Sequence, residues 1–395
     1  MSERSAADRG PVRVLFVQYT NPAAYPPVEH GARLLKESGC EVRVLGIGAL
    51  QGALVFRPES AGDVRLMSFA EPGWRQKVHY LRFCAWVMAQ AISWRPHWIY
   101  ASDPLSCPVA LALSYLPGIR AVYHEHDSPS EGTAGMALPM RRVMWARRAL
   151  ARRARLCVLP NEGRSELFRR TTGAHEVLTV WNTPTRDEVI EGRRSRRVGS
   201  PLRLWFHGSI VPARVPLSLV KALAALPDDI TLAIAGYETA GHPGYVAEFL
   251  GAAAAAGVER RVTVLSAMPR HRLLEACSEA DLGISFGPLD SADVNERMMV
   301  GASNKPFDYM ARGLALVVSD LPEWRATFVE RGFGLACNPE SVPDLVEAIR
   351  WFRDHRAETA CMGERGAGMI RTTWNYEQAF RPVIEIIRGG ANVVH

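Results

Sequence analysis

Short apolar, β-branched runs alternate with longer amphipathic stretches along the whole chain. This alternation predicts strands joined by helices, and therefore an α/β fold with parallel sheets. In the first half we predict strands at 12–17, 41–45, 64–69, 98–101, 121–124, 156–159 and 177–180. A second series predicts strands at 202–206, 231–235, 262–265, 282–285, 316–319 and 334–336, with a helix near 217–225.

The stretch between the two series loses its apolar periodicity and is rich in arginine, which is typical of a linker. We therefore expect an N-terminal Rossmann-like domain over 1–182, a linker over 183–200 and a C-terminal Rossmann-like domain over 201–373. Ligands of doubly wound sheets bind outside the carboxyl ends of the strands. Two such domains facing each other would form a central cleft.

The composition is that of a globular protein, with 48% hydrophobic and 22% charged residues among 395. No apolar run approaches the roughly 20 residues that span a bilayer, and the polar N-terminus does not resemble a signal peptide. We expect a cytoplasmic protein. The seven cysteines lie far apart without a Cys-x-x-Cys pair, so we expect free thiols packed as small apolar residues.

Arginine dominates the formal net charge of +6, and the stretch 141–155 is the densest basic segment. Its apolar residues recur at helical spacing, which predicts one basic amphipathic helix. Three interpretations stay open: a solvated surface face, attraction to an anionic membrane surface or a phosphorylated acceptor, and nucleic-acid binding. We do not expect nucleic acid as a partner, since neither interleaved aromatic residues nor a recognisable binding module accompanies the charge.

The stretch 301–320 carries the most informative candidate chemistry. Ser303 or Asn304 can cap a helix, and Pro306 suits its first turn because proline lacks an amide hydrogen. Backbone amides would then point at an anion, and Lys305 adds a point charge, so a diphosphate fits there. Asp308 lies about one turn into the helix, where it either meets the hydroxyls of a ribose or complements the helix dipole.

This stretch resembles the nucleotide-binding domain of family 4 glycosyltransferases, which have the GT-B fold. Asn304, Lys305, the run 307–311 and Gly313 stand in register with a pattern of one branch, Pro-Asn-Lys-Leu-Phe-Glu-Tyr-Met-Ala. The likeness continues in order from Phe206 to the end of the chain. It implies that Asp308 takes the place of a glutamate that binds the donor ribose. It also implies that a last helix, over 374–395, returns toward the N-terminal domain.

The resemblance implies a retaining glycosyltransferase of the hexosyltransferase type, which moves a sugar from a nucleotide diphosphate to a hydroxyl acceptor. No cofactor and no metal are expected, because Arg214, Lys305 and helix amides would neutralise the departing diphosphate. The implied nucleotide-binding residues are Gly208, Ser209, Ser303, Asn304, Lys305, Pro306 and Asp308, and the implied catalytic residues are His126, Arg214 and Lys305. The acceptor stays open among a polysaccharide or lipid-linked intermediate and a small natural product.

Two departures from the family pattern leave alternatives open. Ser209 replaces the usual arginine of the loop after the first strand, so that Arg214 takes the position of the usual lysine. Gly301 replaces a second glutamate that often touches the donor sugar, and Glu296 or Asp293 would have to substitute for it. A catalytically inactive sugar-nucleotide-binding protein and a nucleotide-sugar epimerase of the same fold are the competing hypotheses.

In the first domain, His126 follows a predicted strand and so lies at its carboxyl end. The residues alone allow a metal site of His124, His126 and Asp103, or a neutral histidine that only forms hydrogen bonds within its loop. The resemblance implies a contact of His126 with the donor sugar near the reacting carbon. The loop 18–25 lacks the two adjacent glycines that are usual in the family.

Overall fold

The computed structural model describes residues 10–48, 55–57, 62–71, 73–129, 136–192, 201–239 and 241–389. The chain forms two compact units. The N-terminal unit comprises Met1–Trp181 and Ala379–His395, and the C-terminal unit comprises Asn182–Gln378. Residues 193–200 of the expected linker lie outside the described residues, whereas residues 182–192 belong to the C-terminal unit.

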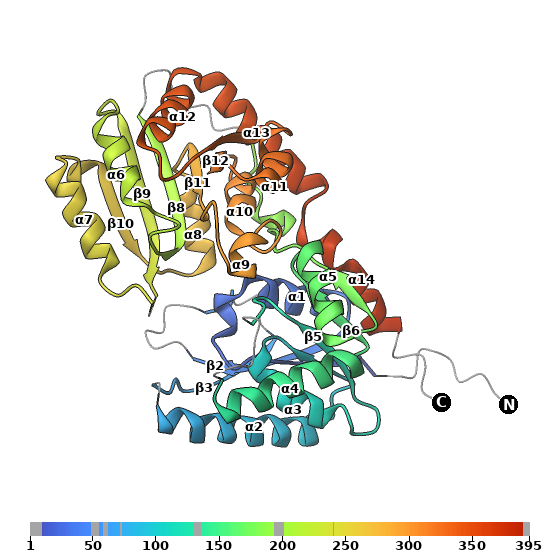
Figure 1. The fold of residues 1–395 in the computed structure, drawn as a ribbon. Helices are drawn as coiled ribbons and strands as arrows, with labels where there is room; N and C mark the ends of the chain where they lie inside the picture. The colour runs from blue at the N-terminus through green and yellow to red at the C-terminus, as the bar shows by residue number, and fades with distance from the viewer. Residues whose placement is uncertain are drawn as a thin grey trace. The chain divides into compact units, whose positions relative to one another are not determined.

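The N-terminal unit is built on a seven-stranded parallel sheet of order β3-β2-β1-β4-β5-β6-β7 (Figure 1). Its strands are β1 (Arg13–Val17), β2 (Glu41–Ile47), β3 (Asp63–Met67), β4 (Trp98–Ala101), β5 (Arg120–His124), β6 (Leu156–Leu159) and β7 (Val177–Thr179). Its helices include α1 (Pro26–Glu37), α2 (Trp74–Trp94), α3 (Cys107–Leu113), α4 (Leu138–Arg153) and α5 (Glu162–Thr172). The central strands are buried, which explains why they appear in the sequence as continuous apolar runs.

The C-terminal unit has a six-stranded parallel sheet of order β10-β9-β8-β11-β12-β13. Its strands are β8 (Leu202–Ile210), β9 (Ile230–Glu238), β10 (Val262–Ser266), β11 (Leu282–Ser285), β12 (Ala315–Ser319) and β13 (Gly334–Cys337). Its helices are α6 (Leu217–Ala224), α7 (Tyr245–Ala255), α8 (Arg270–Cys277), α9 (Val294–Arg297), α10 (Lys305–Ala311), α11 (Pro322–Trp324), α12 (Val342–Asp354) and α13 (Arg356–Thr372). All predicted strands of both series are confirmed, and so is the helix predicted near 217–225.

Each sheet has one point at which the strand order reverses, between β1 and β4 in one unit and between β8 and β11 in the other. Loops that leave neighbouring strands in opposite directions at such a point open a crevice at the carboxyl edge of the sheet. The end of β8 lies at this point in the C-terminal unit. The loop after β1 and Ser102, which follows β4, lie at it in the N-terminal unit.

The last helix, α14 (Tyr376–Gly389), contributes its residues from Ala379 onward to the N-terminal unit. There the buried Phe380 ring packs against Gly31 of α1 and lies 6.4 Å from the Tyr100 ring of β4. A side chain on residue 31 would meet this ring, so the absence of one lets the helix seat closely.

The predicted basic helix is confirmed as α4. Within the described residues, no helix is both long and apolar enough to span a membrane. All seven cysteines are free thiols, as predicted. The expectation that all are packed inside is wrong for Cys361, which is exposed on α13.

Two glycines allow β8 and β9 to approach each other closely at their carboxyl ends. Gly208 and Gly236 are register partners, and Gly208 has a φ of 122°, a backbone conformation that disfavours other residues. A Cβ on Gly236 would overlap the carbonyl oxygen of Gly208. The backbone at this edge of the sheet therefore depends on a glycine at position 236.

We predict that Gly236→Ala lowers the free energy of unfolding by about 1–3 kcal/mol, because the added methyl forces the two strands apart. The control is Gly251→Ala in α7, where a Cβ meets nothing within 4 Å. That change should instead stabilise the helix by roughly 0.5–1 kcal/mol. Urea unfolding of both variants measures the difference, and equal stabilities would contradict the close approach of the strands.

Candidate functional site

The end of β8 and the start of α10 bring four predicted residues together. The Lys305 side chain lies where a Cβ on residue 208 would stand, so the lysine packs directly over Gly208. In the next residue, the Ser209 hydroxyl accepts a hydrogen bond from Nη1 of Arg214. Two cationic side chains thus converge on Gly208 and Ser209, at the point where the strand order reverses.

The predicted start of α10 is confirmed in position, with Asn304 as the N-cap residue and Pro306 in the first turn, but the expected side-chain capping bond is absent. The Nδ2 of Asn304 instead donates to Oδ2 of Asp308 over 2.9 Å. The Ser303 hydroxyl is buried without a hydrogen-bond partner in the described part of the chain. Pro306 in the first turn of this seven-residue helix has no amide hydrogen, and the Asp308 amide donates to the Asn304 carbonyl as the ordinary first hydrogen bond of the helix. Positive charge at this site comes mainly from Lys305 and Arg214.

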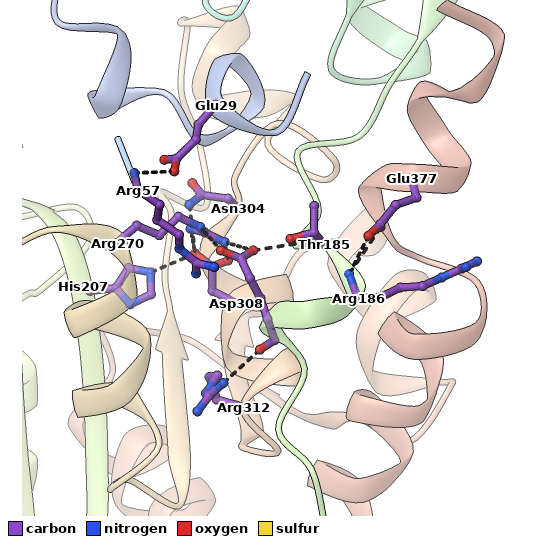
Figure 2. A network of polar contacts seen from close by, with 11 residues as sticks. Glu29, Arg57, Thr185, Arg186, His207, Arg270, Asn304, Asp308, Arg312 and Glu377 are labelled. Atoms are coloured by element: carbon purple, nitrogen blue, oxygen red, sulfur yellow. Dashed lines mark hydrogen bonds and ion pairs between the residues drawn. The ribbon is translucent and has the colours of Figure 1, made fainter. Parts of the chain in front are cut away.

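Asp308 is part of a buried charge network centred on Arg270, the first residue of α8 (Figure 2). Arg270 Nη2 and Nη1 donate to the two Asp308 carboxylate oxygens over 2.6 and 3.0 Å. The same guanidinium donates to both oxygens of Glu188, over 2.7 Å from Nε and 2.9 Å from Nη2. One buried arginine therefore binds two buried carboxylates, each with paired hydrogen bonds.

Glu188 belongs to the segment that joins the two strand series and comes from the short helix Arg186–Glu188. Its carboxylate also accepts the backbone amide of Thr185 over 3.2 Å, and its carbonyl accepts Nη1 of Arg312 over 2.9 Å. Figure 2 shows Thr185 and Arg312 joined by dashed lines to the same network that contains Arg270 and Asp308. The network thus ties this segment to α8 and α10.

His207 completes the surroundings of Asp308 from β8. Its Nδ1 accepts a hydrogen bond from the Trp205 indole over 3.0 Å, so in the neutral ring the proton lies on Nε2. That Nε2 lies 3.3 Å from the Asp308 carboxylate. Burial lowers the pKa of His207, which keeps the ring neutral near pH 7. Burial alone would raise the pKa of Asp308, but Arg270 and His207 hold it below the usual value.

These contacts change the interpretation of Asp308. Its carboxylate has no exposed surface, and both oxygens already have donors. A ribose would have to displace Arg270 or Asn304 to reach it. The geometry therefore favours a structural role over the predicted ribose contact, although the partner is Arg270 rather than the helix dipole of the alternative.

Sequence reasoning missed Arg270, Glu188 and His207. Only Glu188 carried a local signal, because Thr185 and Glu188 have the spacing of a capping box. Arg270 is one of many arginines, and its two partners lie 38 and 82 positions away in the sequence. Nothing in its own neighbourhood distinguishes it.

We predict that Asp308→Asn lowers the free energy of unfolding by about 3–5 kcal/mol, because it removes one charged partner of a buried arginine. The control, Glu275→Gln, removes an exposed partner of Arg272 on the same helix and should change stability by less than about 0.5 kcal/mol. Denaturant unfolding and titration with a nucleoside diphosphate are measured together. Unchanged stability with weakened nucleotide binding would return Asp308 to the ribose role.

The predicted sugar-contacting residues near α9 have structural partners. Oε2 of Glu296 accepts the Ser291 hydroxyl over 2.6 Å, and Asp293 caps α9 by accepting the amide of Asn295. Gly301 has a φ of 80°, and its carbonyl accepts the amide of Asn182 over 2.7 Å.

In the N-terminal unit, His126 lies just beyond the end of β5 and is 6% exposed. Its Nε2 is 2.9 Å from the Ser102 hydroxyl, and its ring packs against those of Tyr25 and His124, with centroids 5.1 and 4.1 Å away. Nδ1 is buried and has no hydrogen-bond partner among the described residues. Because buried polar atoms normally have partners, Nδ1 is the ring atom available to a ligand.

Two arginines stabilise the loop that carries His126 by contacts with its backbone and with the neighbouring Glu125. Nη1 of Arg164 donates to the His126 carbonyl over 2.9 Å, and Arg147 of α4 forms a buried ion pair with Glu125. This explains one arginine of the basic helix: Arg147 faces inward and stabilises the loop. One side of α4 therefore faces the interior, and only its other side can face solvent or lipid.

His126 and His124, the last residue of β5, are both neutral in the folded protein. Burial lowers the pKa of His126 to about 3 and that of His124 well below its usual value. Asp103 accepts the amides of Tyr19 and Ser106 over 3.0 and 2.8 Å. Among the residues that the structure describes, no group of three His, Cys, Asp or Glu side chains is arranged to hold a metal ion. The alternative of a metal site formed by His124, His126 and Asp103 therefore gains no support.

Two doubly wound parallel sheets with helices on their faces are the architecture of the GT-B fold. Residues 27–183 match the family described as glycosyl transferase 4-like domain. The N-terminal unit therefore contains a glycosyl transferase 4-like domain, and the resemblance to family 4 glycosyltransferases is confirmed. No curated protein has a significantly similar sequence.

Solved structures with the same fold cover nearly the whole chain. Sucrose-phosphate synthase from Thermosynechococcus elongatus has 14% identity and a TM-score of 0.72, over 96% of this chain and 99% of that one. HepE from Anabaena, in complex with UDP and glucose, has 16% identity and a TM-score of 0.71, over 96% and 100%. WaaG, a glycosyltransferase involved in lipopolysaccharide biosynthesis, has 16% identity and a TM-score of 0.66, over 95% and 100%.

Proposed function

We propose that this protein transfers a hexosyl group from a nucleotide-diphosphate sugar to a hydroxyl acceptor, with retention of anomeric configuration. The observation that carries the proposal is the convergence of Lys305 and Arg214 on Gly208 and Ser209. Two cations beside a glycine, at the point where the strand order reverses, suit a diphosphate. The HepE structure of the same fold, which contains UDP and glucose, supports a nucleotide-sugar donor.

The reaction requires the protein to stabilise the negative charge that develops on the departing diphosphate. When the bond between sugar and diphosphate breaks, negative charge builds on the departing oxygen, and fixed cations stabilise that state more than the ground state. Lys305 is held against the backbone of residue 208, and Arg214 is held by Ser209. Both are thereby positioned before the donor arrives, and a side chain that needs no reorganisation gives its full electrostatic stabilisation.

We assign His126 to the sugar rather than to the nucleotide. Ser102 holds Nε2, so Nδ1 remains for a sugar hydroxyl. A pKa of about 3 means that the ring acts as a neutral hydrogen-bonding group and not as an imidazolium. This role agrees with the family resemblance, in which the histidine of this loop contacts the donor sugar.

The competing functions differ in their products. A glycosyltransferase releases nucleoside diphosphate from its donor, and without an acceptor it does so slowly by transferring the sugar to water. An epimerase instead interconverts two nucleotide sugars. An inactive binding protein does neither. Incubation with a panel of nucleotide sugars, followed by chromatography of nucleotides and sugars, distinguishes the three. Nucleoside diphosphate release is the result that supports the proposal, and sugar interconversion or binding without turnover overturns it.

We predict that Lys305→Ala and Arg214→Ala each lower turnover roughly 10²-fold, because each removes a cation that acts on the departing diphosphate. The matched controls are Lys221→Ala and Arg272→Ala, which change an exposed lysine of α6 and an exposed arginine of α8. They should leave turnover unchanged. Steady-state kinetics with equal amounts of folded protein make the comparison. Full turnover in the site variants would show that the two cations have only a structural role.

For His126 we predict that alanine lowers kcat and kcat/KM about tenfold or more, while affinity for nucleoside diphosphate stays unchanged, because only the contact with the sugar is lost. His126→Gln should retain more activity, since an amide still forms hydrogen bonds. Turnover should show no step from this ring between pH 5 and 8, because it takes up a proton only as the pH falls toward 3. Weakened nucleotide affinity in His126→Ala would refute the assignment.

A further inference from the structure

Helix α2 presents an apolar stripe to solvent along its length. The exposed apolar positions are Trp74 (70%), Val78 (46%), Leu81 (68%) and Ile92 (63%). These positions recur at intervals of three or four residues and their multiples, so they share one side of the helix. Phe83 and Val87 are fully buried on the opposite side. The helix is therefore apolar on two faces, and only one of them is covered by the unit.

The orientation of α2 is fixed by polar contacts on its inner side. The Tyr19 hydroxyl lies 3.0 Å from Nδ1 of His79, and the Tyr80 hydroxyl donates to the Leu105 carbonyl over 2.8 Å. The helix cannot rotate to bury the stripe without breaking these bonds and exposing the core residue Phe83. The exposed stripe is therefore a fixed feature of the surface.

Basic residues flank the stripe, and acidic residues are missing from it. Arg75, Lys77 and Arg82 lie on both sides of the apolar positions, and the sequence of α2 contains neither Asp nor Glu. An apolar stripe with only positive flanks is the pattern of a helix that lies in a membrane interface.

Helix α4 adds a second surface of the same kind. Its exposed residues include Arg141, Arg142, Trp145 and Arg148, and it too contains no Asp or Glu. Both helices pack against α3, which places them on the same side of the sheet (Figure 1). We call the exposed sides of α2 and α4 the α2–α4 surface.

We propose that the α2–α4 surface docks on a lipid bilayer that carries anionic headgroups. The α2 stripe and Trp145 enter the boundary between headgroups and acyl chains, and the exposed arginines and Lys77 bind headgroup phosphates. Charge complementarity selects this occupant, because both helices are purely basic and their apolar residues include tryptophans. The proposal does not depend on glycosyl transfer, so its test can fail while the proposed function stands.

The test uses the full chain and vesicles of phosphatidylcholine with or without about one third phosphatidylglycerol, a composition rich enough in anionic lipid for exposed basic residues to respond. We expect the wild type to sediment with the anionic vesicles at low salt and to be released at least in part at 0.5 M salt, where exposed charges are screened. Wild type that stays in the supernatant with both kinds of vesicle overturns the proposal.

Two variants and a control distinguish vesicle binding through the α2–α4 surface from non-specific binding. The variant Trp74→Ser with Leu81→Ser should lose at least tenfold in vesicle partition, and Arg75→Gln with Arg82→Gln should lose a similar factor at low salt. The control is Leu250→Ser, which changes an exposed leucine of α7 in the other unit and should sediment as the wild type does.

Sedimentation velocity without lipid tests a second copy of the chain as the occupant. Concentration-dependent dimers that the Trp74 and Leu81 variant abolishes, without vesicle binding by the wild type, would assign the stripe to self-association and overturn the proposal. Vesicle binding that survives both double substitutions would also overturn it.

Discussion

The buried guanidinium of Arg270 is the contact on which the C-terminal unit depends most. A buried arginine is costly unless its charge is compensated, and here Glu188 and Asp308 supply two carboxylates from distant parts of the chain. Removal of either carboxylate leaves charge in the interior without its partner. The segment around Glu188, the start of α8 and the start of α10 therefore adopt their positions together. Lys305, three residues before Asp308, is positioned as a consequence.

In this arrangement the buried charges stabilise the fold, and the accessible charges are left for the ligand. The Asp308 carboxylate has no exposed surface and takes part in folding, whereas Lys305 and Arg214 are half-buried beside Gly208 and Ser209. A glycine with a φ of 122° lets the lysine lie against the backbone, and Gly236 lets β9 approach it. The proposed chemistry thus needs one rigid backbone edge, two cations beside it and a buried ion pair that keeps α10 in place.

The strands and the basic helix could be predicted from the sequence, because apolar runs and helical periodicity are local signals. The position of α10 could also be predicted, since Pro306 and the motif around it are local. The partners of Asp308 could not, because Arg270 and Glu188 reach it only through tertiary packing. The exposed stripe of α2 was equally hidden: a helix with apolar residues on two sides lacks the polar face that would indicate which side is buried. The sequence also did not distinguish Arg147, which faces inward, from the exposed arginines of α4.

The most direct test of this account is hydrogen exchange in Arg270→Met, compared with the wild type by mass spectrometry. If Arg270 holds three segments together, peptides that cover residues 183–191 and 305–311 should lose protection along with the start of α8, while α12 keeps its protection. Faster exchange confined to α8 would contradict the account. It would mean that Glu188 and Asp308 keep their positions without the arginine.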